Sequence, residues 1–328
     1  RSITLMPGVV PLALRLPLTG KRNVDGRDRA RGSGARFAST LTFEDQRYLQ
    51  RCRAIEPPPD LPNGQFDVVA EVKTVWRILR SASPGEALVV FSNRGLLKPE
   101  LIATALFRLL PRRKRPLVVV YGDLWQVSTG IRAVVEKTAL RLIDPGVAQY
   151  VCHTRSSADF VQEFWSISSS KVTVLPYYFD PRTTNGSHVA NDTGYVFSGG
   201  DSGRDFGPVL RLARERPDVR FVINTTRLGN RDVPSNVELR AERTEGYAAL
   251  MEGAAVVILP LRTDLRRGVG TLTLLLAALF EKPLIVTSAF GVADYMTNGE
   301  HALFVDSSIQ QYRAALDCVI DPAQKSEV

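Results

Sequence analysis

The sequence contains few of the residues that build disulfide frameworks or zinc sites. Its three cysteines, Cys52, Cys152 and Cys318, lie far apart, and its three histidines are isolated from them and from one another. A sparse, odd set of cysteines argues against a disulfide framework and is typical of a reducing compartment. Zinc sites repeat cysteine or histidine at short intervals, so we expect no metal site of this kind.

Long hydrophobic runs and several familiar motifs are also missing. The longest apolar runs, 254–261 and 272–280, are well short of the about 18 residues that a membrane-spanning helix needs. There is no Walker A sequence and no Gly-x-Ser-x-Gly elbow, which argues against a P-loop nucleotidase and an α/β-hydrolase. We expect a cytoplasmic protein.

The charge of the chain is basic. The formal net charge is +8, and basic residues gather in 21–36 and in 112–115. A basic surface favours anionic partners such as nucleotides and lipid headgroups. An exposed run at 112–115 would suit peripheral contact with an anionic membrane at its inner face, although solvated loops also carry such runs. Because no nucleic-acid-binding module is recognisable, we expect no nucleic-acid partner.

Short apolar strands alternate with helices in two stretches of the 328 residues. Such alternation is typical of parallel sheets covered on both faces, so we predict an α/β fold with two Rossmann-like, doubly wound domains facing a central cleft. The first helix is predicted from apolar residues at helical spacing, namely Val68, Val69, Val72, Val75, Trp76 and Leu79. Strands are predicted at 87–91, 117–121, 147–153, 172–175, 195–198, 219–223, 237–239, 256–259, 284–286 and 302–305.

The domain boundaries follow from composition. Residues 1–182 are expected to form the acceptor-side domain, with an irregular and basic stretch at 1–64. A polar segment at 183–193 is interpreted as the linker, because it contains little apolar material. Residues 194–328 then form a nucleotide-sugar-binding domain with a closing helix.

Two glycine-rich loops in the second half can bind a diphosphate. The first contains Gly199, Gly200 and Arg204 and lies between a predicted strand and a predicted helix. The second contains Gly268, Gly270, Thr271 and Leu272 and opens an apolar helix. Glycine lets the backbone approach an anion, a helix start offers N–H donors, and arginine can pair with phosphate. Tight turns built from the same residues are the alternative interpretation.

Three segments carry a family resemblance: EGYAALMEGAAVVILP at 245–260, TLTLLLAALFEKPLIV at 271–286 and GVADYMTNGEHALFV at 291–305. They resemble the C-terminal half of the large retaining family of GT-B glycosyltransferases (group 1, similar to family 4). In the first half, VCHTRS at 151–156 and VTVLPYYFD at 172–180 resemble the family's exit from its first domain. The resemblance implies a nucleotide-sugar donor in the second domain and an acceptor in the first.

The resemblance also implies roles for particular residues. Both glycine loops would contact the diphosphate, and the loop from Glu238 to Ala241, which includes Leu239, would hold the base. Arg204 and helix dipoles would stabilise the leaving diphosphate, so that neither a metal nor a cofactor is needed; the absence of an Asp-x-Asp triplet agrees with this. Asp123 is a candidate acceptor-side base, although aspartate is also a common helix cap. The acceptor side is expected at Asn93, Arg94, Gly122, Asp123 and His153.

The sequence departs from the family at two positions. The family's paired glutamates fall on Gly268 and Leu276, so both carboxylates are missing. The main hypothesis is a glycosyltransferase of polysaccharide biosynthesis that moves a sugar to a glycan, a lipid-linked acceptor or a small molecule. A catalytically silent relative that binds nucleotide or glycan, or supports a partner enzyme, is the alternative. A nucleotide-sugar epimerase of the same fold fits less well, because no acid/base set is evident.

Overall fold

The computed structural model describes residues 37–39, 52–55, 68–91, 98–124, 127–177, 194–229, 233–243 and 245–320. All of them belong to one compact unit that spans 35–328. The predicted linker at 183–193 and the predicted acceptor-side residues Asn93 and Arg94 lie outside the described residues. In the described part of the chain, every helix is too short or too polar to span a bilayer.

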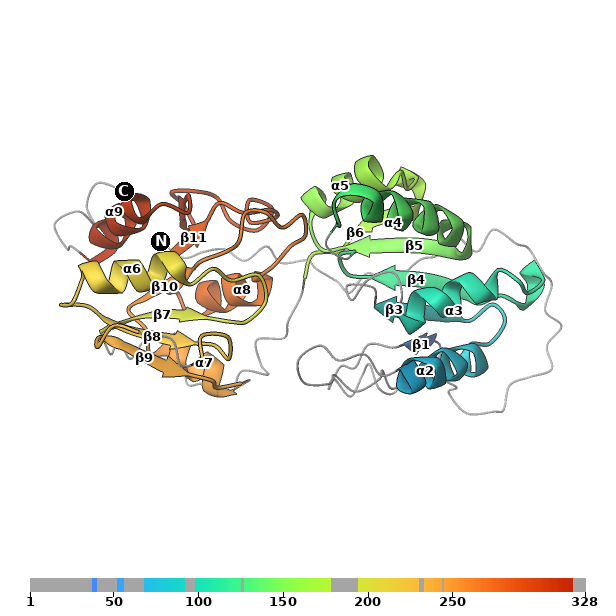
Figure 1. The fold of residues 1–328 in the computed structure, drawn as a ribbon, viewed down its shortest axis with the longest axis horizontal. Helices are drawn as coiled ribbons and strands as arrows, with labels where there is room; N and C mark the ends of the chain where they lie inside the picture. Colours follow the sequence, from blue (N-terminus) through green and yellow to red (C-terminus); the bar gives the residue numbers. More distant parts are fainter. Residues whose placement is uncertain are drawn as a thin grey trace, which may run out of the picture. The chain divides into compact units, whose positions relative to one another are not determined.

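The first sheet has six parallel strands in the order β2-β1-β3-β4-β5-β6 (Figure 1). Side chains such as Leu88, Val120 and Tyr150 are buried in its core. The helices that accompany it are α2 (Val68–Ser81), α3 (Pro99–Phe107), α4 (Gly130–Ile143) and α5 (Arg155–Trp165). The strands are β1 (Phe37–Ser39), β2 (Cys52–Ala54), β3 (Ala87–Phe91), β4 (Leu117–Tyr121), β5 (Val147–Cys152) and β6 (Val172–Val174).

Two of these strands lie where the sequence analysis expects irregular structure. Strands β1 and β2 fall within the stretch 1–64, and β1 pairs with both β2 and β3. Each is three residues long, too short for an alternating pattern to stand out from its neighbours. Their pairing with segments distant in sequence, rather than local preference, makes them strands.

The second sheet also has six parallel strands, in the order β12-β11-β10-β7-β8-β9. Its helices are α6 (Gly207–Glu215), α7 (Glu245–Glu252), α8 (Thr271–Leu279) and α9 (Ile309–Ile320). Two parallel sheets flanked by helices confirm the predicted α/β fold with two domains. The strands are β7 (Tyr195–Gly199), β8 (Arg220–Asn224), β9 (Val237–Arg240), β10 (Val256–Leu259), β11 (Leu284–Thr287) and β12 (Leu303–Val305).

The strand order of the second sheet locates the place where a ligand fits. From β7 the chain adds β8 and β9 on one side, and then returns to add β10, β11 and β12 on the other. The two loops that leave the carboxyl ends of β7 and β10 therefore diverge to opposite sides. In open parallel sheets, ligands bind beside such a switch point.

Candidate functional site

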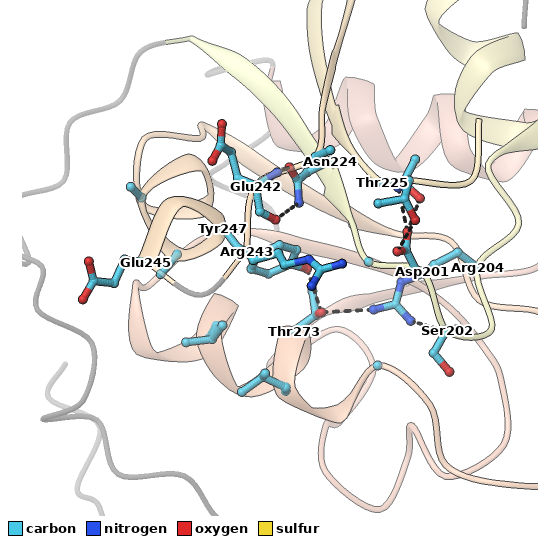
Figure 2. Close-up of a pocket in the computed structure, with 18 of the residues that line it drawn as sticks. Asp201, Ser202, Arg204, Asn224, Thr225, Glu242, Arg243, Glu245, Tyr247 and Thr273 are labelled. Atoms are coloured by element: carbon cyan, nitrogen blue, oxygen red, sulfur yellow. Dashed lines mark hydrogen bonds between the residues drawn. The ribbon is translucent and has the colours of Figure 1, made fainter. Parts of the chain in front are cut away.

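A cavity of about 670 Å³ lies at the carboxyl ends of β7, β8 and β9. Its lining comes from the loops after these strands and from helices α7 and α8 (Figure 2). A volume of several hundred Å³ is typical of sites for small organic molecules. The cavity therefore occupies the position that the strand order of the second sheet predicts for a ligand.

Arg204 supplies a cation to this cavity. Its Nε donates to the carbonyl of Gly199 at 2.8 Å. Its Nη1 donates to the carbonyl of Ser202 at 2.8 Å, and its Nη2 to Oγ1 of Thr273 at 3.1 Å (Figure 2). Burial lowers the pKa of this guanidinium, but arginine remains charged. Nη1 and Nη2 each carry a second N–H. A side-chain hydrogen bond with Tyr247 takes up one of these, so the structure holds a largely buried cation rigidly, with an N–H left for an anionic ligand.

Two glycines make room for the Arg204 guanidinium. Gly200 has φ +105°, and a Cβ there would lie 2.7 Å from Nη2 of Arg204. Gly270, at φ +80°, precedes the first residue of α8, and a Cβ there would lie 3.1 Å from Nη1. Side chains rarely adopt such positive φ values, so both positions favour glycine. The N-terminus of α8 thus lies beside Arg204, and both groups attract negative charge.

Hydrogen bonds accepted by Asp201 join the loops after β7 and β8. Its Oδ1 accepts from the Thr225 hydroxyl and from the backbone N–H of Thr226 at 2.9 Å, and its Oδ2 accepts from the Thr226 hydroxyl at 2.6 Å. Burial opposes ionisation of Asp201, but these hydrogen bonds outweigh it and lower the pKa of the carboxyl. Asp201 is therefore ionised and holds the two loops together.

Two further contacts complete the frame of the cavity. Nδ2 of Asn224 donates to the carbonyl of Glu242 at 2.9 Å, and Oδ1 of Asn224 accepts from the N–H of Glu242 at 2.7 Å. The hydroxyls of Tyr247 and Thr273 share a hydrogen bond of 2.9 Å, which joins α7 to α8. Each loop around the cavity is thus attached to a neighbouring segment, a preorganised arrangement that reduces the cost of ordering the site on binding.

The far part of the cavity has a different chemistry. Leu276 of α8 and Phe280 line it, together with Ala248 and Ala249 of α7. Glu252, at the end of α7, also lines the cavity, and its Oε1 is buried with no hydrogen-bond partner among the described residues. A buried carboxylate oxygen without a donor is costly, so a ligand O–H or N–H would be favourable here.

The structure brings most of the predicted donor-side residues together. Gly200, Arg204, Gly270 and Leu272 line the cavity, Gly199 contributes the carbonyl that holds Arg204, and Thr271 is the first residue of α8. These positions match the two predicted loops. Their binding of a ligand stays a prediction.

The predicted base-binding loop, 238–241, meets the cavity lining at Ala241. Glu238 and Leu239 lie within β9, and the Glu238 carboxylate pairs with Arg220 at 2.7 Å and with Arg240. Strand β9 continues to Arg240, one residue past the predicted strand end. The segment that lines the cavity is therefore 241–243, directly after the strand.

Three predicted acceptor-side residues lie at the carboxyl ends of β4 and β5. Gly122 follows β4 at φ +90°, and Nδ1 of His153 lies 3.1 Å from the carbonyl of Leu175. Oδ2 of Asp123 accepts from the backbone N–H of Gly268 at 2.8 Å, while its Oδ1 is buried with no partner among the described residues. Asp123 is thus held in place with one carboxylate oxygen unused.

The sequence analysis did not identify several residues that frame the cavity. Asn224 and Thr225 come just after the predicted strand 219–223, and Asp201 lies three residues after the predicted strand 195–198. Polar residues near strand ends are a signal of a site in a parallel sheet. Tyr247 and Glu252 carry no comparable signal, because a helix exposes many such residues. The described residues contain no group of three or more His, Cys, Asp and Glu that could hold a metal ion.

The role of Gly200 gives a first prediction. We expect Gly200→Ala to lower the free energy of unfolding by about 1–3 kcal/mol, because alanine is strained at this φ and its Cβ displaces Arg204. Gly229→Ala is a matched control: Gly229 has φ +52° and open space around its Cβ, so about 1 kcal/mol is expected there. Denaturant unfolding measures both, and equal losses in the two variants would contradict the clash with Arg204.

Comparisons with known proteins agree with this architecture. No protein-family model matches the chain, and no curated protein matches it in sequence. Among solved structures, it resembles HepE of Anabaena in complex with UDP and glucose (TM-score 0.57, 14% identity), with UDP (0.56, 13%) and with UDP-glucose (0.58, 13%). Each match covers 85% of this chain and 79% of the other. The likeness confirms the predicted GT-B fold class.

Proposed function

We propose that this protein is a glycosyltransferase that takes a sugar from a nucleotide-diphosphate sugar. The observation that carries the proposal is the cavity in which Arg204 and the N-terminus of α8 meet. Structures of HepE, which shares the fold, contain UDP and UDP-glucose, so a uridine nucleotide is the first donor to test.

The proposed chemistry needs stabilisation of a leaving diphosphate. As the bond between the sugar and the diphosphate breaks, negative charge grows on the diphosphate oxygens. A buried guanidinium and the N–H groups at the start of α8 stabilise that charge strongly where water is excluded. These groups are in place before the ligand binds, so we propose transfer without a metal ion.

The charges of the cavity also suggest how the donor lies in it. Arg204 and the start of α8 attract a diphosphate, and the nearby Asp201 carboxylate is already held by the hydroxyls of Thr225 and Thr226. Oε1 of Glu252 has no such donor, so the diphosphate belongs beside Arg204 and not beside Glu252. The hydroxyls and ring N–H groups of the nucleoside are neutral donors that can satisfy the buried Oε1 of Glu252. We therefore place the nucleoside toward Glu252, Leu276 and Phe280.

This orientation predicts the behaviour of Glu252→Gln. We expect Kd for UDP to rise about fivefold, because a hydrogen bond to a charged acceptor becomes one to a neutral amide, a loss of about 1 kcal/mol. Inorganic pyrophosphate, which lacks the nucleoside, should bind both proteins equally. Calorimetric titration measures both ligands, and a variant that binds pyrophosphate more tightly would instead place Glu252 beside the phosphates.

For the acceptor substrate, we propose a chemical class and no single compound. A hydroxyl of a glycan, a lipid-linked sugar or a small molecule would approach from the side of Gly122, Asp123 and His153. The imidazole of His153 and the unused Oδ1 of Asp123 are both groups on that side that can accept a proton, and Asp123 is the one held in place by a backbone N–H. We propose Asp123 as the residue that activates the acceptor hydroxyl.

A donor-hydrolysis assay tests the function as a whole. The protein is incubated with UDP-, GDP-, ADP- and TDP-sugars in the presence of EDTA, and release of the nucleoside diphosphate is followed. Slow release from one donor, lost in Arg204→Ala, would support a metal-independent transferase. Release that requires added Mg²⁺ or Mn²⁺ would contradict the metal-free mechanism.

The catalytically silent relative has one observation in its favour. Leu276, at one of the two positions where the family resemblance leads us to expect a glutamate, lines the cavity with an apolar side chain. A silent relative would bind a nucleotide-diphosphate sugar but leave it intact, even with acceptors present. The same hydrolysis assay, combined with titration, separates the two functions.

A further inference from the structure

The helices of the first sheet present an unusual outer surface. The sequence analysis interprets the apolar stripe of α2 as one face of an amphipathic helix, and such a face ordinarily packs on a core. In the structure most of that stripe faces outward: Val68, Val69, Val72 and Trp76 are exposed, and Trp76 keeps 55% of its surface accessible. Glu71, Thr74 and Ile78 occupy the buried side instead.

Helix α4 also has an apolar stripe that faces outward. Ile131, Val134, Val135 and Leu142 recur at helical spacing and are all exposed, with accessible fractions from 84% at Ile131 to 56% at Val135. The opposite side of the helix, with Glu136, Leu140 and Ile143, is buried. A continuous apolar stripe on the outside of a helix indicates a surface that is covered in use.

The two helices belong to one layer. Strands β3 to β6 follow one another in order across the sheet, and right-handed crossovers then place their connecting helices on the same face. Helix α2 packs against α3, and α3 packs against α4 (Figure 1). Between them, at the end of α3, Leu109 is 80% exposed. The layer thus carries exposed apolar side chains on α2, on α4 and after α3; we call this surface the outer face.

The exposed charges on α2, α3 and α4 have one sign, whereas α5, which belongs to the same layer, carries exposed Asp159 and Glu163. The acidic residues of the three helices, Glu71, Glu100 and Glu136, are all buried. The exposed charged residues on these helices are basic: Lys73, Arg77, Arg80, Arg132 and Arg141. After α3, the short helix η2 (Arg112–Lys114) adds three exposed cations.

A groove lies near η2, and hydrogen bonds from arginine side chains connect the segments beside it. This groove of about 510 Å³ is lined by Arg108, Arg112 and Arg115. Arg108 donates to the carbonyl of Leu142, which ties the end of α3 to the end of α4. Nη2 of Arg115 donates to the carbonyl of Arg108 at 2.6 Å. Arg108 and Arg115 are therefore fixed near the ends of α3 and α4.

We propose that the outer face binds the surface of an anionic lipid bilayer. Apolar side chains interleaved with Lys and Arg are typical of surfaces that lie in the headgroup region, whereas the centres of protein–protein interfaces are depleted of charge. The long basic side chains keep their charges among the headgroups while neighbouring leucines enter the acyl boundary. In the second domain, by contrast, the exposed large apolar residues among those described are Leu272 and Ile320.

Vesicle sedimentation tests the proposal with the full chain and without nucleotide, so that its result is independent of the transferase assay. We expect binding to phosphatidylcholine vesicles that contain phosphatidylglycerol, and little binding to phosphatidylcholine alone. Arg112→Glu with Arg113→Glu should lower the partition coefficient by at least about thirtyfold, from the attraction lost per basic residue. Ile131→Ser with Leu142→Ser should lower it by about tenfold, because less apolar surface is buried.

The matched control is Arg211→Glu with Arg313→Glu, two exposed positions on α6 and α9 of the second domain that change the net charge equally. This control should bind anionic vesicles within about fourfold of the wild type if the location of the charges matters and net charge alone does not. Equal binding to both lipids, no vesicle binding, or an equal loss in the control would overturn the proposal. Self-association that is abolished by Ile131→Ser with Leu142→Ser, without vesicle binding, would assign the outer face to a second copy of this chain.

Discussion

Replacing Arg204 by alanine is expected to raise the Kd for a nucleoside diphosphate about ten- to a hundredfold, a loss of roughly 1.5–3 kcal/mol. The physical reason is that a charge-assisted hydrogen bond from a buried guanidinium is removed where little water can replace it. Calorimetric titration with UDP, and with whichever nucleotide binds best, measures the effect. An unchanged Kd would contradict the assignment of this part of the cavity to the diphosphate.

A control for Arg204→Ala must distinguish the loss of ligand binding from the loss of hydrogen bonds that hold the loop after β7. Arg204 also holds the carbonyls of Gly199 and Ser202, so its loss loosens the frame. Arg204→Lys keeps the charge but cannot make the same set of hydrogen bonds. We expect it to share the loss of thermal stability seen in the alanine variant while recovering part of the nucleotide affinity. Equal affinity losses in both variants would point to the frame rather than to the charge.

Asp123→Asn is expected to lower kcat for sugar transfer about a hundredfold or more, with little change in Kd for the nucleotide. An amide cannot accept the proton of the acceptor hydroxyl, and general-base catalysis contributes an effect of about this size. The amide oxygen can still accept from the N–H of Gly268, so the local structure should persist. Transfer to the acceptor, measured under single-turnover conditions, is the appropriate readout.

A comparison of substitutions at Asp123 distinguishes catalysis from positioning. If Asp123 serves only to hold Gly268, the asparagine variant should remain active and Asp123→Ala should lose activity. If Oδ1 takes the proton, both variants should be impaired to a similar degree. A fully active Asp123→Asn would therefore remove Asp123 from the proposed chemistry and leave it as a structural contact.

Much of the fold could be predicted because its signals are local. The predicted strands 87–91, 117–121 and 256–259 match β3, β4 and β10 residue for residue, because short apolar runs bounded by turns are a clear signal of buried strands. Strands β1 and β2 could not be found, because three residues carry no period and their pairing is non-local.

The site was predictable to the extent that backbone conformation requires particular residues. Gly200 and Gly270 stand at positive φ, and a glycine-rich loop reveals such positions from sequence. The hydrogen bonds that Thr225 donates to Asp201 and that Asn224 donates to Glu242 join separate loops. They depend on strand order, which one sequence does not specify, so these residues were not identified in advance.

The outer face shows a different limit of sequence patterns. Periodicity gives the apolar stripe of α2 but does not say which side of the helix faces the core. Ile78 and Thr74 pack inward, with Glu71 beside them held by Lys98 at 2.8 Å. Whether Val72 and Trp76 are exposed depends on how α2 packs against its neighbours, which only the three-dimensional structure shows.

The most direct test of the central claim is calorimetric titration of the full chain with UDP, GDP, ADP and TDP in the presence of EDTA. If Arg204 and the start of α8 form a diphosphate site, at least one of these nucleotides should bind, and the corresponding nucleoside without phosphates should bind much more weakly. If no nucleotide binds, or if nucleoside and nucleotide bind equally, the two glycine loops are only turns and the proposed donor site is wrong.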